Sequence, residues 1–291
     1  MDESLKKHLL AGAAMAQNYD FCSGYGLQSV SGGKRYGKRT GSSMEFMEHR
    51  DYQAGDDLRT LDWSVYARTD KLVVKMFQEE IAPRLDLIID CSRSMNVESL
   101  HKAEAAMRLA GLFAQAALNC GFIIKSYLSH NTFSSVVNGH LPPENWIDIN
   151  FTGDINPYEA MKNRSSSFQS NSLRVFISDL LWEEHPRKLL AMLNENARGV
   201  FVVQLLGKNE LNPVLDGNSK LLDVESGVED DLFIDSTALR NYAEALKNHI
   251  SFWQRSCRGV NAFLTTLEAD SICSKWKIDK LIEIGLIARS S

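Results

Sequence analysis

Three oxygen-bearing side chains follow an apolar run near the start of the second third of the chain. Asp90, Ser92 and Ser94 form a D-x-S-x-S pattern directly after the run at 84–90. A carboxylate and two hydroxyls at alternate positions of a tight turn can point to one centre. Hard oxygen donors of this kind suit Mg²⁺ or Mn²⁺ rather than a metal that prefers thiolates. The pattern therefore predicts a divalent-metal site, with Cys91 pointing away from it.

A second acid is expected from another strand. The run at 172–179 is again apolar and ends in Ser178-Asp179. In an open parallel sheet, ligands gather in the crevice outside the carboxyl ends of the strands. Mg²⁺ also keeps several waters when it has few protein ligands. We therefore expect Asp179 to contribute directly or through water, at an ion that retains open positions.

A structural interpretation of the same residues is also available. Serine and aspartate after a strand are ordinary turn and helix-capping residues. The D-x-S-x-S pattern alone is compatible with either interpretation. Its place after one apolar strand, together with a second strand that ends in Asp179, favours the metal site.

The elements that would position these residues alternate regularly after Pro83. Near-continuous apolar strands separated by helices are typical of a parallel sheet that is buried on both faces. The predicted fold class is α/β, with a Rossmann-like, mostly parallel sheet and helices on both faces. Strands are expected at 84–90, 122–128, 172–179, 200–206 and 260–264, and helices at 98–119, 186–197, 238–256 and 270–284.

The part of the chain before this alternation has a different character. An opening helix is expected around 9–16, and the Gly- and Lys-rich segment 31–43 is expected to be loop. We expect two parts, a smaller irregular β region at 1–81 and the α/β domain at 82–291. Short strands or turns are predicted at 59–68 and 71–77.

Composition limits the classes of function. Hydrophobic residues make up 44% and charged residues 24% of the 291 residues, which is enough apolar material for a sizeable core. The formal net charge of −5 gives no general case for nucleic-acid binding, since such proteins usually carry a basic excess. No apolar run approaches the roughly 18 residues of a membrane helix, so no membrane span is expected.

The compartment is expected to be the cytoplasm. Five cysteines lie far apart without a CxxC pair, which is typical of a reducing environment. The segment 9–16 (LLAGAAMA) loosely mimics the apolar part of a signal peptide. Asp2 and Glu3 precede it, however, so it lacks the positively charged start of such a peptide.

The two strand-end motifs are similar to a known metal site. Asp90, Ser92 and Ser94, followed by a helix and later by ISD at 177–179, resemble the metal-ion-dependent adhesion site of von Willebrand factor A domains. The resemblance implies a von Willebrand factor A-like fold. It also implies a bound Mg²⁺ or Mn²⁺ that accepts a Glu or Asp carboxylate from a client protein.

One position departs from that family's pattern. A loop threonine usually contributes to the site shortly before a helix that contains Ala-Leu, and the matching stretch here is 151–161. Aligning the Ala-Met pair at 160–161 puts Ile155 at the threonine position. Thr152 or Asp154 would substitute only if the loop shifts. The resemblance therefore implies a degenerate last ligand and weak metal affinity.

A series of motifs in fixed order precedes the strand at 84–90. They are EF at 45–46, RDY at 50–52, GDDLR at 55–59, LDW at 61–63, AR at 67–68, KMF at 75–77 and EE at 79–80. These motifs resemble the signature of the bacterial family called domain of unknown function fifty-eight, in which such a segment precedes an A-type domain. The resemblance covers about residues 20–285. Members of that family commonly accompany MoxR-type AAA+ ATPases, which implies such an ATPase as partner and a role in assembling or remodelling other proteins.

The sequence thus favours a metal-dependent protein-recognition module that is not an enzyme. One alternative is a Mg²⁺-dependent phosphoester hydrolase, because a metal ion beside carboxylates can activate water. Such chemistry needs a further base or a second metal, and Asp154 is the spare acid near the motif. The other alternative is a structural scaffold with a vestigial metal site.

Overall fold

The computed structural model describes residues 2–21, 44–79, 82–162, 166–182, 184–214, 217–222 and 229–290. The chain divides into a larger unit, residues 1–35 with 83–291, and a smaller unit, residues 36–82. The predicted boundary between residues 81 and 82 lies next to the end of this smaller unit, whereas the first helix, which was placed with the smaller part, packs within the larger unit. The loop predicted at 31–43 and the thiol of Cys22 lie outside the described residues.

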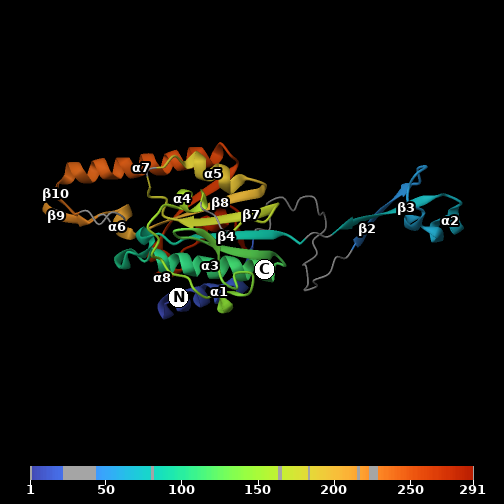
Figure 1. Ribbon diagram of the computed structural model, residues 1–291, viewed down its shortest axis with the longest axis horizontal. Coiled ribbons are helices and arrows are strands. Elements are labelled where there is room, and N and C mark those ends of the chain that lie inside the picture. Colours follow the sequence, from blue (N-terminus) through green and yellow to red (C-terminus); the bar gives the residue numbers. More distant parts are fainter. Residues whose placement is uncertain are drawn as a thin grey trace. The chain divides into compact units, whose positions relative to one another are not determined.

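A six-stranded sheet forms the centre of the larger unit (Figure 1). Its order is β11-β8-β7-β4-β5-β6, with every neighbouring pair parallel except β5 and β6. Counted along the chain from the β6 edge, this order is 3-2-1-4-5-6, that of a doubly wound fold. The predicted α/β class with a mostly parallel sheet is confirmed. The strands are β4 (Arg84–Asp90), β5 (Ile123–Ser129), β6 (Phe133–Ser135), β7 (Ser172–Ser178), β8 (Ala197–Leu206) and β11 (Ala262–Glu268).

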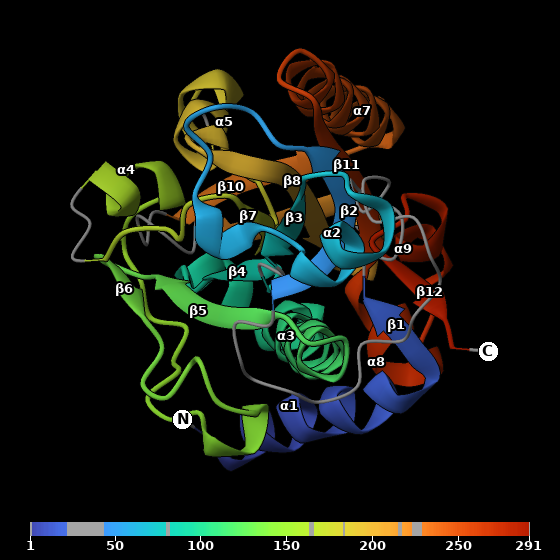
Figure 2. The same ribbon diagram turned by 90° about the vertical axis from the view of Figure 1, so that its right-hand side faces the viewer.

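Helices cover both faces of this sheet (Figure 2). On one face α3 (Lys102–Asn119), α8 (Ala269–Lys275) and α9 (Asp279–Glu283) share a core with Leu87 and Ile89 of β4. On the other face α4 (Pro157–Lys162), α5 (Pro186–Asn194) and α7 (Ser236–Arg258) pack around Ile88. Alternate residues of one apolar strand therefore face two different cores, as expected for a sheet that is buried on both sides.

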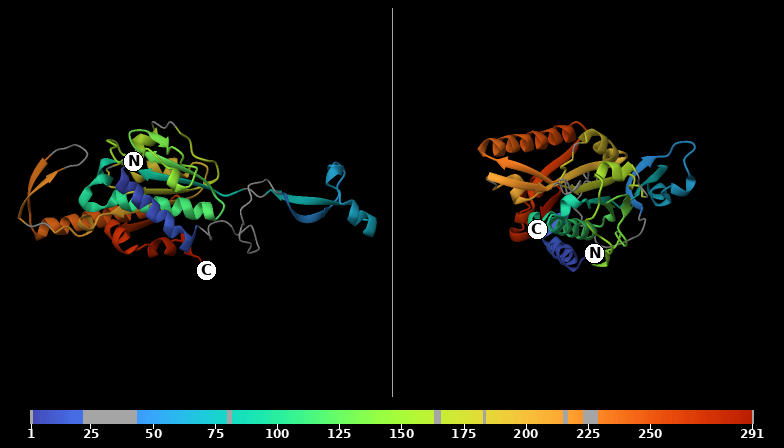
Figure 3. Two further views of the ribbon diagram at one scale, coloured as in Figure 1. Left: turned by 90° about the horizontal axis from the view of Figure 1, so that it is seen from below. Right: turned by 60° about the vertical axis from the view of Figure 1, so that its left-hand side comes forward.

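The first helix adds a further layer beneath α3 (Figure 3). Helix α1 (Glu3–Met15) buries Leu9 completely and Gly12 against α3, and a short 3-10 turn, η1 (Ala16–Asn18), follows it. The helix predicted around 9–16 is confirmed. Within the part of the chain that the structure describes, no helix combines the length and apolar character that crossing a bilayer requires.

Several predicted boundaries moved for local reasons. The helix expected from residue 98 begins at Lys102, because His101 adopts a left-handed conformation (φ 49°) after the 3-10 turn η5 (Glu98–Leu100). The last helix, expected over 270–284, divides into α8 and α9 because Trp276 is also left-handed (φ 53°). Such a conformation interrupts the regular helical hydrogen bonds.

Some short elements were not predicted. The larger unit also contains the antiparallel pair β1 (Tyr19–Phe21) and β12 (Ile287–Arg289), which joins the two ends of that unit. The hairpin of β9 (Gly217–Leu222) and β10 (Glu229–Ile234) follows the one-turn helix α6 (Lys208–Leu211). These elements are too short, or too polar, to produce a clear periodic pattern.

The smaller unit is built on the antiparallel pair β2 (Met44–Asp51) and β3 (Val73–Glu79). The short strand or turn predicted at 59–68 is wrong, because α2 (Trp63–Thr69) forms there. The Asp62 carboxylate caps this helix by accepting hydrogen bonds from the amides of Ser64 and Val65. A hydrogen bond from His49 lowers the pKa of Asp62 to about 2.

Candidate metal centre at the ends of two central strands

Asp90 is the last residue of β4 and is completely buried. One carboxylate oxygen, Oδ2, accepts a 2.6 Å hydrogen bond from the hydroxyl of Ser178, the last residue of β7. The other, Oδ1, accepts a 3.0 Å hydrogen bond from the amide of Ser92. Since β4 and β7 are parallel neighbours, these bonds join the carboxyl ends of the two strands.

The two motif serines lie in the turn that follows β4. The hydroxyl oxygens of Ser92 and Ser94 are 2.9 Å apart, and Ser94 belongs to the 3-10 turn η4 (Arg93–Asn96). Cys91, between Asp90 and Ser92, is fully buried in the core shared with α3. Cys91 is thus part of the core, while the two hydroxyls lie beside each other.

Asp179 follows β7 directly and is 1% exposed. Its Oδ2 accepts a 2.8 Å hydrogen bond from the ammonium of Lys102, and its Oδ1 accepts one of 3.2 Å from the amide of Leu181. The side-chain amide of Gln204 in β8 donates to its carbonyl oxygen at 2.9 Å. Asp179 thus lies at the same edge of the sheet as Asp90, held by the backbone and by an ion pair.

Lys102 and Glu210 were not identified from the sequence. Lys102 is the first residue of α3, is 1% exposed, and also donates to Oε1 of Glu210 at 2.7 Å. Oε2 of Glu210 accepts a 2.7 Å bond from the amide of Gly207 and so caps α6. Only the glutamate of the capping-box pattern is present here, because Gly207 has no side chain, so the sequence did not indicate this cap. No local pattern indicates that Lys102 lies between two carboxylates.

The loop that contains Thr152 and Asp154 lies beside the motif turn. Gly153 exchanges backbone hydrogen bonds with the motif turn, donating to the carbonyl of Cys91 and accepting from the amide of Arg93, both at 2.9 Å. A Cβ on Gly153 would lie 3.0 Å from the carbonyl oxygen of Cys91, so this close approach favours glycine.

The side chains of that loop already have protein partners. The hydroxyl of Thr152 bonds to Nε2 of His130 at 2.8 Å and to Asn150 at 3.1 Å. The carboxylate of Asp154 pairs with Arg93 at 2.6 Å on an exposed surface. The structure therefore brings Thr152 and Asp154 to the motif turn, while their role as metal ligands stays a prediction.

The electrostatics of the centre suit a bound cation. Burial, and then the neighbouring Asp179 carboxylate, raise the pKa of Asp90 to about 7. Two buried carboxylates and two adjacent hydroxyls form an oxygen-only donor set, which fits Mg²⁺ or Mn²⁺. Among the residues that the structure describes, no group of three or more His, Cys, Asp or Glu side chains is placed to hold a metal. Any metal at this edge would therefore depend on the serine hydroxyls and on water.

The raised pKa of Asp90 predicts a pH dependence of stability in metal-free protein. Unfolded aspartate ionises near pH 4, whereas folded Asp90 stays protonated until about pH 7. Wild-type stability should therefore fall by up to about 1.4 kcal/mol per pH unit between these values, and level off above them. The stability of Asp90→Asn should not fall in this way, because asparagine does not ionise. Urea unfolding at a series of pH values, with divalent cations chelated, measures the free energy of unfolding of both proteins. The difference in favour of Asp90→Asn should grow from pH 4 to pH 7. A constant difference between the two proteins would contradict the assignment.

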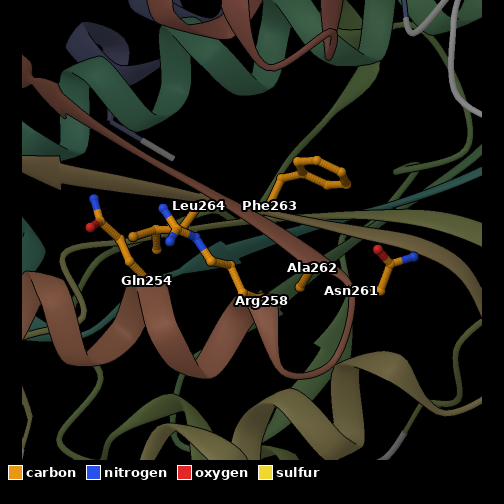
Figure 4. A pocket seen from close by; sticks show the side chains of 6 residues that line it. All are labelled: Gln254, Arg258, Asn261, Ala262, Phe263 and Leu264. Atoms are coloured by element: carbon orange, nitrogen blue, oxygen red, sulfur yellow. The ribbon is translucent and has the colours of Figure 1, made fainter.

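A separate pocket of about 300 Å³ lies elsewhere in the larger unit (Figure 4). Gln254 and Arg258 of α7 line it together with residues 261–264 at the start of β11. Parallel pairing places the start of β11 beside Val200, near the start of β8. The pocket is therefore at the amino ends of the strands, whereas Asp90 and Asp179 are at the carboxyl ends, and it has no part in the candidate metal centre.

The chain is similar to proteins of mycobacteria. It is 26% identical over 266 residues to Uncharacterized protein Mb1516 from Mycobacterium bovis, and equally to Uncharacterized protein Rv1480 from Mycobacterium tuberculosis. Each match covers 84% of this chain and 80% of the relative. The similarity thus extends over both units, to relatives whose own activity is not described.

Two solved structures resemble part of the chain at a TM-score of 0.35 and 12% identity. They are the conserved hypothetical protein BatB from Bacteroides thetaiotaomicron and an aerotolerance-related membrane protein from Bacteroides fragilis. The matches cover 70% of this chain and 98% and 100% of those chains, respectively. A likeness of this size assigns no function.

The second structure is described as a membrane protein, which differs from the cytoplasmic localisation expected from this sequence. That expectation rested on cysteine spacing and on the lack of a positively charged start. These features concern disulfides and signal peptides, and they do not exclude association with a membrane. The cytoplasmic assignment is therefore not kept.

One segment of the chain matches a described family. Residues 48–130 run from β2 through β4 and α3 to the end of β5, so the segment includes Asp90, both motif serines and Lys102. The resemblance noted in the sequence is supported over this segment, and the family that residues 48–130 match is Protein of unknown function DUF58.

Proposed function

We propose that this chain is a metal-dependent protein-recognition module of the von Willebrand factor A type. The observation that carries the proposal is the position of Asp90 and Asp179 at the carboxyl ends of β4 and β7. These are strands 1 and 4 of the order 3-2-1-4-5-6, and the order reverses between them. Ligands of doubly wound sheets bind at this topological switch point.

In this proposal Asp90, Ser92 and Ser94 hold Mg²⁺ or Mn²⁺, and Asp179 contributes directly or through water. The bound ion would supply a positive centre with open positions for a carboxylate from a client protein. The backbone amide of Ser92 and the hydroxyl of Ser178 orient the Asp90 carboxylate before any ligand arrives. Such orientation reduces the entropy that binding would otherwise cost.

The surroundings of the motif turn would provide specificity for the client. Arg93 and Asp154 pair on the surface beside the motif, with their side chains 50% and 46% exposed. The hydrogen-bonded side chains of Thr152 and His130 are next to them. Exposed charges of both signs around a recognition point favour partners with complementary charge and disfavour others.

The family resemblance extends the proposal to a partner. The match of residues 48–130 to DUF58 supports a link to MoxR-type AAA+ ATPases, which that resemblance implies. We infer that the recognition module and such an ATPase act together when other proteins are assembled or remodelled. The module would select the client through a Glu or Asp side chain, and the ATPase would supply the energy.

Calorimetric titration with Mg²⁺ and Mn²⁺ tests the metal site. We expect saturable binding by the wild type and a loss of at least about 100-fold in affinity in Asp90→Ala, since a ligand and its charge are removed. Asp231→Ala, which removes an exposed carboxylate of β10, is the matched control and should bind like the wild type. The absence of saturable heat in the wild type would favour the vestigial scaffold.

Recognition can be tested by immobilising this protein and measuring whether it retains a purified MoxR-type ATPase and a client that the ATPase captures from lysate. We expect the wild type to retain both proteins in Mg²⁺. Both should be lost when the metal is chelated, and also when Asp90→Ala replaces the wild type. Equal retention with Mg²⁺ and with chelator would contradict the proposal. Metal-dependent hydrolysis of aryl phosphates that is lost in Asp90→Ala would replace it with the phosphoesterase.

A further inference from the structure

Lys102 occupies an unfavourable place for an ammonium group. It is 1% exposed, and as the first residue of α3 it lies at the positive end of a helix dipole. A buried charge is tolerated only when it is paired and hydrogen-bonded. Asp179 at 2.8 Å and Glu210 at 2.7 Å provide that pairing. The charge of Lys102 therefore depends on these two carboxylates.

One of the two partners of Lys102 is also a proposed metal ligand. Lys102 binds Oδ2 of Asp179, while the Leu181 amide binds Oδ1. A divalent ion that uses Asp179 directly would meet the ammonium at the same carboxylate. Two cations at one carboxylate repel each other strongly in a buried site. The ion and Lys102 therefore compete for Asp179.

The second partner allows Lys102 to release Asp179 without becoming unpaired. Glu210 is fixed independently of Lys102, because its Oε2 accepts the Gly207 amide at 2.7 Å and the Tyr242 hydroxyl donates to its carbonyl oxygen at 2.8 Å. Its Oε1 remains the acceptor for Lys102. With Asp90, the group contains three acidic side chains and one ammonium, so acidic groups outnumber the cation at this edge of the sheet.

We propose that Lys102 is an internal cation that holds Asp179 in the metal-free protein and yields it to the divalent ion while it stays bound to Glu210. The inference rests on the proposed metal site and adds the residue that sets its affinity. Lys102 keeps the site assembled without metal, at the cost of weaker metal binding. A monovalent ion, with half the charge, would displace it less effectively.

Lys102→Met tests the competition, because it removes the charge and keeps the length of the side chain. Calorimetry should show Mg²⁺ and Mn²⁺ bound at least about tenfold more tightly than by the wild type, since a competing cation is gone. Without metal the variant should melt at a lower temperature, because two carboxylates lose their partner. Saturating Mg²⁺ should raise its melting temperature more than it raises that of the wild type. Lys188→Met, which breaks an exposed pair with Glu184, is the matched control and should leave affinity unchanged.

Glu210→Gln should change affinity in the opposite direction. Lys102 then depends on Asp179 alone, so the variant should bind metal several-fold more weakly than the wild type. In the Lys102→Met background the same substitution should have a much smaller effect, because the residue that it acts through is absent. This coupling separates competition from a general effect of charge near the site.

Weaker or unchanged metal binding by Lys102→Met would overturn the inference and show that Lys102 only positions Asp179. The proposed function would survive that result if wild type binds metal and Asp90→Ala does not. If Lys102→Met binds metal and the wild type does not, Lys102 competes with the metal as inferred. The proposed metal-dependent recognition by the natural chain would then be rejected. Absence of binding in every variant would overturn both.

Discussion

Replacing Arg174 by alanine is expected to lower the free energy of unfolding by about 3–5 kcal/mol, since it breaks a buried ion pair from one side. Arg174 is 1% exposed, and its Nε lies 3.7 Å from a carboxylate oxygen of Asp86, which is completely buried. Its Nη1 donates to the carbonyl of Leu193 at 2.7 Å, in the last turn of α5. The substitution therefore removes the counter-charge of Asp86 and a cap of α5 together.

Urea unfolding followed by tryptophan fluorescence measures this loss, because Trp63 alone among the five tryptophans belongs to the smaller unit. Arg187→Ala, at an exposed position of the same helix α5, is the matched control and should change stability by less than about 0.5 kcal/mol. Replacing Asp86 and Arg174 together by leucine and methionine should cost less than Arg174→Ala alone. A loss below about 1 kcal/mol in Arg174→Ala would show that the pair is not important for stability.

Replacing Gly111 by alanine is expected to destabilise the protein, although the same change inside an ordinary helix stabilises it by about 0.5–1 kcal/mol. A Cβ on Gly111 would lie 2.0 Å from the carbonyl oxygen of Leu9 and 2.9 Å from the amide nitrogen of Ala13. On the other helix, a Cβ on Gly12 would lie 1.8 Å from the carbonyl oxygen of Arg108. The backbones of α1 and α3 are therefore in direct contact. An added methyl group would have to displace a helix backbone rather than a flexible side chain.

The expected loss for Gly111→Ala is about 1–3 kcal/mol, with α1 displaced from α3. Limited proteolysis should show faster cleavage at Lys6 and Lys7, and the melting temperature should fall. Gly259→Ala provides the control, because its Cβ would meet nothing closer than 3.4 Å and its φ is −63°. Unchanged melting and cleavage in Gly111→Ala would show that the two helices separate at no cost.

Regular patterns in the sequence were sufficient for the α/β class and for the main strands. Four of the seven residues in each of β4 and β7 are apolar, and short apolar runs of this kind are typical of strands in a buried parallel sheet. The predictions failed where single residues decide the local structure. The side chain of Asp62 starts α2 where a strand or turn was expected, and left-handed His101 delays the start of α3. The membership of α1 in the larger unit depends on its contact with α3, which lies about 100 residues further along the chain.

The candidate site also contains residues that the sequence predicts and residues that it does not. Asp90, Ser92 and Ser94 are neighbours in the chain, and Asp179 ends a recognisable strand, so residue type and spacing alone were enough to identify them. Lys102 is 77 residues from Asp179 and 108 from Glu210. No periodicity links positions so far apart, because their contact arises only when α3, β7 and α6 meet at one edge of the sheet. The sequence by itself determined which oxygen-bearing side chains follow the two strands, and the tertiary structure alone decided that an ammonium group is bound to one of them.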